Sequence, residues 1–160
     1  LIMKLILLCT VFVFAGLSCK NAGSQSGNGA LTWLTIEEAG KLGASNNDKK
    51  FLIDVYTDWC GWCKVMDKKT FTDHELIKYL NENFHVVKFN AEQKETLSFR
   101  GQTYNWQSSG RNGVNMLALE LLQGRLSYPT LVYLNENLEP IRVSPGYKDA
   151  PQLIAELKSL

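Results

Sequence analysis

The chain has 160 residues, of which 45% are hydrophobic and 21% charged, a composition that can build the core of one globular domain. Its 17 lysines and arginines nearly balance its 16 aspartates and glutamates. Proteins that bind nucleic acid through its phosphates usually carry a basic excess or a basic stripe, and this sequence has neither. Composition and charge therefore argue against nucleic-acid binding and identify no other partner.

The first nineteen residues have the pattern of a secretory leader. Lys4 precedes an apolar run over 5–17, which is shorter than the roughly 20 residues that a membrane-spanning helix needs. Gly16-Leu17-Ser18-Cys19 is similar to a bacterial lipobox, although its leucine stands two residues before the cysteine rather than three. We therefore expect residues 1–19 to be a signal peptide with a lipobox, and Cys19 to carry a lipid anchor. A buried hydrophobic segment and ordinary cleavage nearby are the alternatives.

Residues 20–30 are rich in glycine, serine and asparagine, which predicts a flexible linker and leaves 31–160 as the folded domain. Of the four cysteines, the two nearest the N-terminus fall in the leader and its cleavage site, so the domain keeps only Cys60 and Cys63. Structural disulfides of exported proteins gain most by closing long loops. A pair separated by two residues therefore indicates chemistry rather than a structural staple.

Helices and strands alternate along the predicted domain. Thr35 and Glu38 form a capping box that opens the first helix, and residues 51–56 are an apolar run typical of a buried strand. The chain then passes through the cysteine pair into a helical stretch at 64–69. The later elements are a helix opened by a capping box at Thr72–Glu75, a strand at 85–90, a long loop or small excursion at 92–113, a helix at 114–122 with Asn112 as its cap, strands at 131–134 and 140–143, and a helix capped by Asp149 and Gln152. This order predicts an α/β fold in which helices flank both faces of a central mixed sheet.

The excursion at 92–113 carries three scattered aromatic residues, Phe99, Tyr104 and Trp106. We expect them to pack over the core. A partner-binding surface is the alternative.

Cys60 and Cys63 stand where the strand at 51–56 gives way to a helix. A thiolate rather than a thiol attacks disulfides, so a working cysteine needs its pKa lowered from about 8.5. The unpaired amides and the dipole of a helix N-terminus stabilise such an anion, which predicts Cys60 as the nucleophile and Cys63, one turn on, as the resolving thiol. We expect Gly61 to let a substrate backbone approach closely and Trp62 to offer it an apolar contact.

Metal binding is the main alternative use of this C-x-x-C pair. A structural zinc site needs four ligands, commonly two such pairs or added histidines. The two histidines, His74 and His85, have no suitable spacing. We therefore expect no metal and no organic cofactor, and a redox-active Cys60–Cys63 disulfide in their place. An inert disulfide is a further alternative.

The segment DVYTDWCGWCK at 54–64 closely resembles the active-site segment of the thioredoxin superfamily, and Tyr128-Pro129-Thr130 looks like the cis-proline loop of that family. The resemblance extends over roughly 31–160 and implies a thioredoxin fold. More narrowly, the chain is similar to bacterial extracytoplasmic thioredoxin-like proteins, including the reductase domain of transmembrane disulfide-reducing proteins.

The resemblance also assigns expected roles around the cysteines. Asp54 matches a buried family acid that helps to deprotonate the second thiol, and a carboxyl group inside an apolar strand has a raised pKa suited to this task. Lys88 matches a lysine that neighbours this acid. An aspartate that is merely hydrogen-bonded and a lysine that is simply solvated are the alternatives.

Three further residues are expected to form the substrate site. Trp59 matches a family residue that packs beside the cysteines. Pro129 matches the cis-proline, which packs against the sulfur atoms, and the backbone of Tyr128 is expected to bind an extended substrate while its side chain shapes the groove.

Trp62 departs from the family pattern, because cytosolic thioredoxins have proline there and oxidising disulfide isomerases have histidine. Trp62 adds no positive charge to stabilise the thiolate, which favours a disulfide reductase or exchange enzyme over a strong oxidant. The resemblance implies disulfide-containing exported proteins as substrates and a membrane electron donor of the disulfide-reducing type. Together with the leader and the lipobox, it predicts a periplasmic, membrane-anchored location. Net disulfide oxidation and a non-catalytic peptide-binding module are the alternatives.

Overall fold

The computed structural model describes residues 29–45, 48–109 and 112–160. The predicted signal peptide, the lipobox with Cys19, and residues 20–28 of the predicted linker lie outside the described residues.

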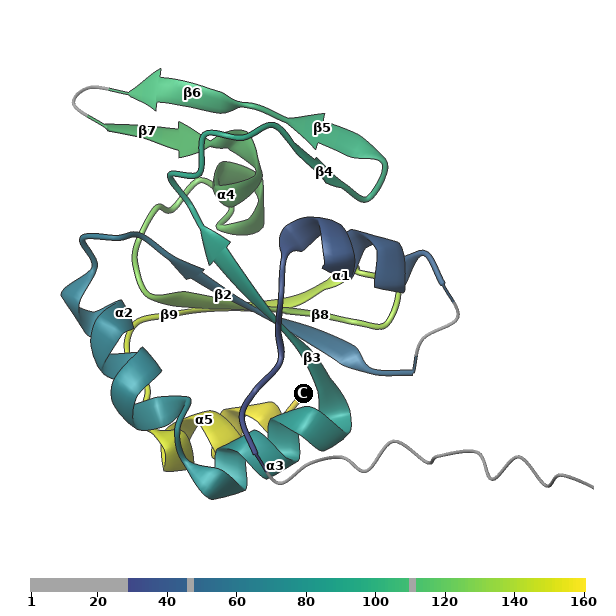
Figure 1. The fold of residues 1–160 in the computed structure, drawn as a ribbon, viewed down its shortest axis with the longest axis vertical. Coiled ribbons are helices and arrows are strands. Elements are labelled where there is room, and N and C mark those ends of the chain that lie inside the picture. The colour runs from purple at the N-terminus through teal and green to yellow at the C-terminus, as the bar shows by residue number, and fades with distance from the viewer. Residues whose placement is uncertain (1–28, 46–47, 110–111) are drawn as a thin grey trace, which may run out of the picture.

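The core of the fold is a five-stranded mixed sheet in the order β1-β3-β2-β8-β9 (Figure 1). The strands are β1 (Trp33–Leu34), β2 (Lys50–Tyr56), β3 (Phe84–Asn90), β8 (Thr130–Leu134) and β9 (Pro140–Pro145). Strands β1 and β2 run parallel to β3, whereas β8 is antiparallel to both β2 and β9. The predicted α/β mixed sheet is therefore confirmed, with one strand, β1, that the sequence did not reveal.

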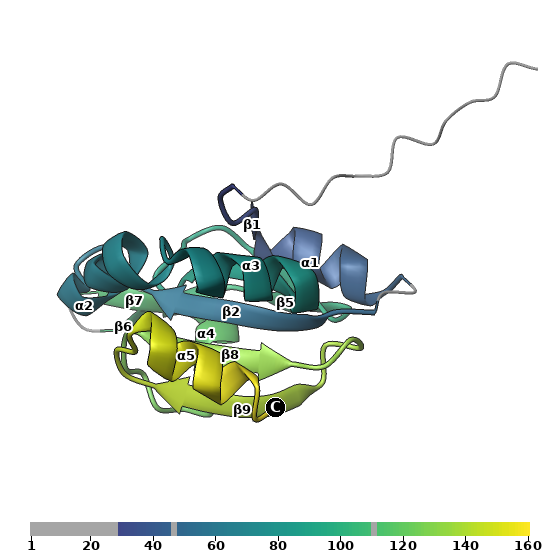
Figure 2. The same ribbon diagram turned by 90° about the horizontal axis from the view of Figure 1, so that it is seen from below.

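The helices cover both faces of this sheet. They are α1 (Ile36–Gly43), α2 (Gly61–Val65), the π-helical turn η1 (Met66–Thr70), α3 (His74–Asn83), α4 (Met116–Leu121) and α5 (Ala150–Leu157). Figure 1 shows α1 and α4 on one side of the sheet, and Figure 2 looks onto the side that α3 and α5 cover. Because successive strand residues point to opposite faces, each face builds its own hydrophobic cluster.

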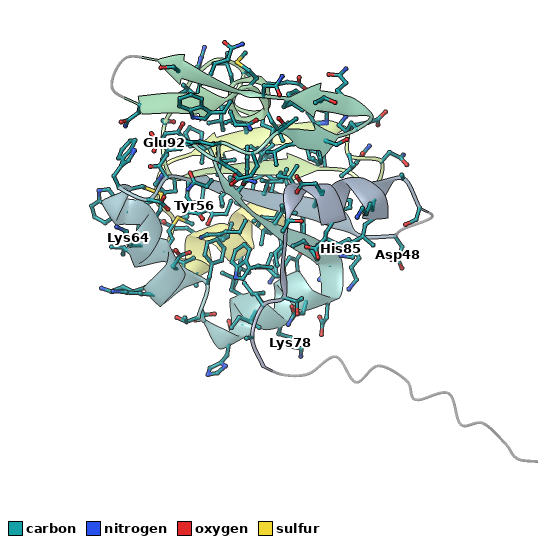
Figure 3. All side chains as sticks on the ribbon, turned by 45° about the horizontal axis from the view of Figure 1, so that its top comes forward. Asp48, Tyr56, Lys64, Lys78, His85 and Glu92 are labelled. Carbon is teal, nitrogen blue, oxygen red and sulfur yellow. A yellow bond between two sulfur atoms is a disulfide. The ribbon has the colours of Figure 1, made fainter. Side chains whose placement is uncertain are left out.

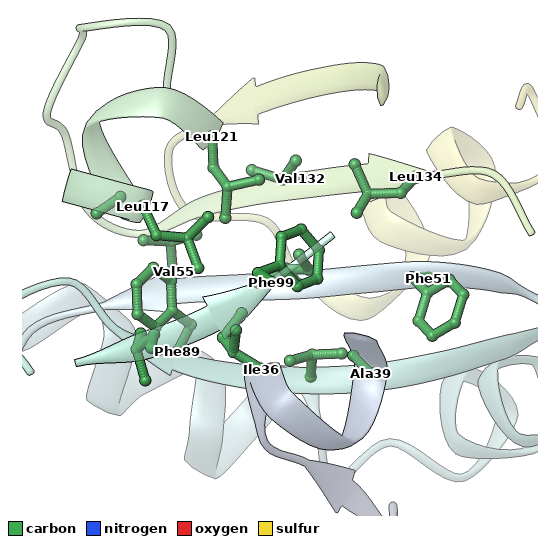
Figure 4. Packing of buried hydrophobic residues seen from close by; sticks show 14 of the residues in the cluster. Ile36, Ala39, Phe51, Val55, Phe89, Phe99, Leu117, Leu121, Val132 and Leu134 are labelled. Carbon is green, nitrogen blue, oxygen red and sulfur yellow. The ribbon is translucent and has the colours of Figure 1, made fainter. Parts of the chain in front are cut away.

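The cluster under α1 and α4 includes Ile36, Phe51, Val55, Leu117 and Val132 (Figure 4). The cluster under η1, α3 and α5 includes Leu52, Met66, Leu76, Leu131 and Leu153. Burying each such side chain contributes about 1.5–3 kcal/mol. Alternation along β2 places Asp54 on the second face, beneath the segment that follows the cysteines.

The capping boxes predicted for the first and last helices are present, whereas the one predicted for α3 is not. The capping boxes of Thr35 with Glu38 and of Asp149 with Gln152 are both formed. The third predicted box is wrong, because Asp73 rather than Thr72 caps α3 by accepting a hydrogen bond from Leu76 N–H.

The predicted helix at 114–122 begins two residues later than expected. Asn115, not Asn112, caps α4, and Asn112 and Val114 belong to a strand that ends where the helix begins.

Of the two readings of 92–113, a long loop or a small excursion, the structure favours the excursion, because the region contains most of two short hairpins outside the central sheet. Strands β4 (Leu97–Phe99) and β5 (Gln102–Tyr104) form the first, and β6 (Trp106–Ser109) and β7 (Asn112–Asn115) form the second. Phe99 and Tyr104 are buried in the core cluster, as expected. Trp106 is half-buried and packs over Gly113, where an added Cβ would lie 1.9 Å from the indole ring.

Candidate active site

Cys60 and Cys63 are joined by a disulfide at the start of α2. Cys60 is the N-cap residue of this helix, and its Sγ accepts a hydrogen bond from the backbone N–H of Cys63 at 3.1 Å. The two residues are only 4% and 1% exposed. The placement expected from the sequence, a sulfur atom over the amides that open a helix, is therefore present. Amides in this position stabilise negative charge on sulfur.

Asp54 and Lys88 face each other from adjacent strands. They are paired in the register of β2 and β3, and Lys88 Nζ donates a hydrogen bond to Asp54 Oδ2 at 2.6 Å. The carboxyl group is completely buried, and its Oδ1 has no hydrogen-bond partner among the described residues. Burial raises the pKa of Asp54 despite the opposing effect of the Lys88 charge. Asp54 is thus suited to hold a proton inside the domain.

Lys88 is not a simply solvated lysine. Its side chain is 22% exposed, and Nζ also donates a hydrogen bond to Asp67 Oδ1 on η1. Burial alone would lower the pKa of Lys88, but the charges and hydrogen bonds of Asp54 and Asp67 outweigh it and raise the pKa. The lysine therefore remains a cation between two acids.

Two tryptophans flank the disulfide on the surface. Trp59 and Trp62 are 60% and 62% exposed, the highest values among the large hydrophobic side chains described. The ring of Tyr128 lies 5.8 Å from that of Trp59 in an edge-to-face arrangement, and Tyr147 lies 5.2 Å from Trp62. Such pairs stabilise the position of each exposed indole. We call these four rings, Trp59, Tyr128, Trp62 and Tyr147, the aromatic border of the cysteines.

Glu92 adds a second restraint on Trp59. Its Oε1 accepts hydrogen bonds from Trp59 Nε1 at 3.0 Å and from Asn112 Nδ2 at 3.2 Å. Figure 3 shows Glu92 between the β6–β7 hairpin and the sulfur atoms of the disulfide. The hairpin is thereby connected to the border of the site.

The backbone near the site includes a cis peptide bond before Pro129 and an accessible stretch at Gly61. The Tyr128–Pro129 peptide bond is cis, and Pro129 is buried. Gly61 is exposed, and a Cβ built on it would meet no atom within 4 Å. A substrate backbone could therefore pass close to the first turn of α2.

Three residues near the site were not identified from the sequence: Asp67, Glu92 and Tyr147. Asp67 lies seven residues after Cys60, a separation with no recognisable motif. Glu92 and Tyr147 reach the site from distant parts of the chain, so that no local pattern indicated them.

The described residues hold no group of three or more histidine, cysteine, aspartate or glutamate side chains that could bind a metal ion. Within the same residues, none of the helices has the length and apolar character needed to cross a membrane.

Two relatives illustrate what the chain is similar to. It is 26% identical over 117 residues to the uncharacterized protein B0495.5 of Caenorhabditis elegans, which covers 73% of this chain and 14% of that protein. It is 29% identical over 111 residues to the thiol:disulfide interchange protein DsbD of Tatumella citrea, which covers 68% of this chain and 16% of DsbD. The match thus spans less than a fifth of either relative.

Solved structures show the same fold. A candidate disulphide-isomerase from Bacteroides thetaiotaomicron superimposes with a TM-score of 0.57 and 27% identity, over 81% of this chain and 91% of that one. The model of the family Thioredox_DsbH, described as a protein of unknown function, DUF255, matches residues 24–152. The chain therefore belongs to the Thioredox_DsbH family of the thioredoxin superfamily, with the fold and the cysteine pair of a thiol–disulfide oxidoreductase.

Proposed function

We propose that the protein reduces or exchanges disulfides in exported proteins through the Cys60–Cys63 dithiol. The observation that carries this proposal is the hydrogen bond from the Cys63 N–H to the Cys60 sulfur at the N-terminus of α2. A thiolate at Cys60 would be stabilised there, and the thiolate is the form that attacks disulfides.

The reaction starts from the reduced dithiol. The Cys60 thiolate attacks one sulfur of a substrate disulfide, which forms a mixed disulfide and releases the first substrate thiolate. Asp54 then accepts the proton of Cys63, whose sulfur attacks Cys60 and displaces the second substrate thiolate. The protein is left with the Cys60–Cys63 disulfide and the substrate with two thiols.

The aromatic border supports a polypeptide substrate. Trp59, Gly61 and Trp62 adjoin the two cysteines in the chain, and the ring of Tyr128, which precedes the cis Pro129, packs against Trp59. We assign the backbone of the cis-proline loop to hydrogen bonding with an extended substrate segment.

A cycle of this kind requires a source of electrons. The similarity to DsbD supports a membrane electron donor of the disulfide-reducing type that reduces Cys60–Cys63 after each turnover. It also supports a periplasmic location. From the lipobox-like sequence at 16–19 alone, we propose that Cys19 carries a lipid that holds the domain at the membrane.

Cysteine variants test the mechanism directly. In the full chain with Cys9 and Cys19 replaced by serine, Cys63→Ser should accumulate a mixed disulfide with a peptide disulfide, whereas Cys60→Ser should form none. Mass spectrometry after acid quenching distinguishes the species. If the Cys60→Ser protein still forms the adduct, Cys63 rather than Cys60 is the attacking sulfur and the proposed roles are wrong.

The direction of electron flow needs a separate measurement. The equilibrium potential of the Cys60–Cys63 couple, measured against glutathione, should be low, and a value well above about −150 mV would favour an oxidase. Peptide binding by the double Cys60→Ser, Cys63→Ser protein without turnover by the parent would favour a binding module.

A further inference from the structure

Lys88 lies between two carboxyl groups that differ greatly in exposure. Its Nζ donates hydrogen bonds to Oδ2 of Asp54 and to Oδ1 of Asp67. The Asp54 side chain is 1% exposed, whereas that of Asp67 is 43% exposed. The three side chains therefore form a continuous hydrogen-bonded series from the interior to the surface.

Aromatic rings hold the Lys88 ammonium group in the middle of this series. Its Nζ lies 5.0 Å from the ring centroid of Trp33, 4.9 Å from that of Tyr56 and 5.6 Å from that of Phe71. Ring faces attract a cation at such distances. The rings thus fix the ammonium group where it can contact both carboxyl groups at once.

A cavity of about 680 Å³ adjoins the outer end of the series. Asp67 and Lys88 line it together with Trp33, Phe71 and His74. The side chain of Asp67 is 43% exposed at the edge of this cavity. A proton that reaches Asp67 can therefore leave directly to water.

The charges favour uptake of one proton. A single ammonium group between two ionised carboxylates leaves one negative charge in excess, so that protonation of either acid neutralises the set. Burial raises the pKa of Asp54, and the Asp67 charge adds to that rise. Tyr56 on β2 and His74 on α3 are the other titratable groups facing Lys88 or the cavity.

We propose that Asp54, Lys88 and Asp67 form a proton relay in which Asp67 is the exit to solvent. The relay rests on the proposed oxidoreductase function and acts in its second step. Asp54 takes the Cys63 proton as the Cys63 sulfur bonds to Cys60 and the bond from Cys60 to the substrate breaks. Asp54 then passes a proton to Lys88 while Lys88 passes one to Asp67. Asp67 releases it to water, and the departing substrate thiolate takes up a proton from water.

The test follows the mixed disulfide in time. The reduced full chain, with Cys9 and Cys19 as serine, is mixed with a peptide disulfide, quenched with acid and analysed by mass. Asp67→Asn should slow decay of the mixed disulfide about tenfold at neutral pH and change its formation less than twofold. Asp67→Glu should restore the native decay rate, and added acetate should accelerate decay in Asp67→Ala.

Glu75→Gln is the matched control, because it removes the same charge from an exposed residue of α3 that is not part of the relay, and its decay rate should equal the native rate. Native decay in Asp67→Asn, equal slowing in Glu75→Gln, or failure of acetate to accelerate Asp67→Ala would each overturn the relay. The absence of any mixed disulfide in the parent protein would instead contradict the proposed function.

Discussion

The two sides of the Cys60–Cys63 disulfide differ in chemistry and in exposure. Toward solvent, the exposed rings of Trp59 and Trp62 border the sulfurs. Toward the core, Asp54 is completely buried with Lys88 as its partner. Apolar rings at a surface favour contact with a partner, whereas a buried carboxyl group with a raised pKa favours proton transfer. The domain thus combines a surface suited to recognition with a buried pair suited to acid–base chemistry.

This arrangement has a kinetic consequence. Changes on the buried side should alter the second chemical step and its pH dependence, and changes on the exposed side should alter the apparent affinity for a peptide substrate. The two kinds of variant can be distinguished by the KM and kcat of one reaction.

The largest expected effect is that of Asp54→Asn. Without a base beneath the cysteines, decay of the mixed disulfide should slow by about 100-fold at pH 7. Rapid acid quenching and mass analysis measure this rate. If the variant decays within threefold of the native protein, the buried carboxyl group is not the base.

The same variant should be more stable than the native protein at high pH. Burial raises the pKa of Asp54 above its ordinary value of 3.8, so the folded state binds more protons than the unfolded state between the unfolded and folded pKa values. Stability therefore falls as pH rises through that window and stays lower above it. Asp54→Asn removes this loss and should therefore unfold at a higher urea concentration than the native protein at pH 8, with the difference disappearing below the window.

Much of the fold and the cysteine chemistry could be predicted from the sequence because both depend on local patterns. The run at 51–56 alternates between two buried faces, and the C-x-x-C pair follows it directly. Strand β1 escaped prediction because two residues cannot show a period. The hairpins at 97–104 and 106–115 escaped because their strands are short and largely polar.

Some details of the site could not be read from local patterns. Thr72 and Asp73 are adjacent residues that can both cap a helix, and only the path of the chain selects Asp73. The contact of Asp67 with Lys88 depends on the position of η1 over β3, and that of Tyr147 with Trp62 on the return of β9 to the sheet. Tertiary packing, rather than spacing, brings these groups together.

An intermediate effect is expected on the exposed side from Tyr147→Ala. Loss of the ring that packs against Trp62 removes about 0.5–1.5 kcal/mol of aromatic contact, which should raise KM for a peptide disulfide roughly threefold to tenfold. The decay rate of the mixed disulfide should keep its native pH dependence. Ile141→Ala, which also shortens an exposed apolar side chain, is the control and should leave KM unchanged. An altered pH dependence in Tyr147→Ala would show that the two sides are coupled.

The smallest effect should come from Glu92→Ala, which frees the Trp59 indole and the Asn112 side chain from their shared acceptor. The Trp59 ring keeps its contact with Tyr128, so KM should rise only about threefold. Glu92→Gln retains an amide oxygen that can accept both hydrogen bonds but carries no charge, and its KM should therefore remain native. If Glu92→Gln is as impaired as Glu92→Ala, the charge of Glu92 rather than its hydrogen bonds matters at this border. In that case electrostatic attraction or repulsion of the substrate, and not the fixed position of Trp59, would determine affinity on the exposed side.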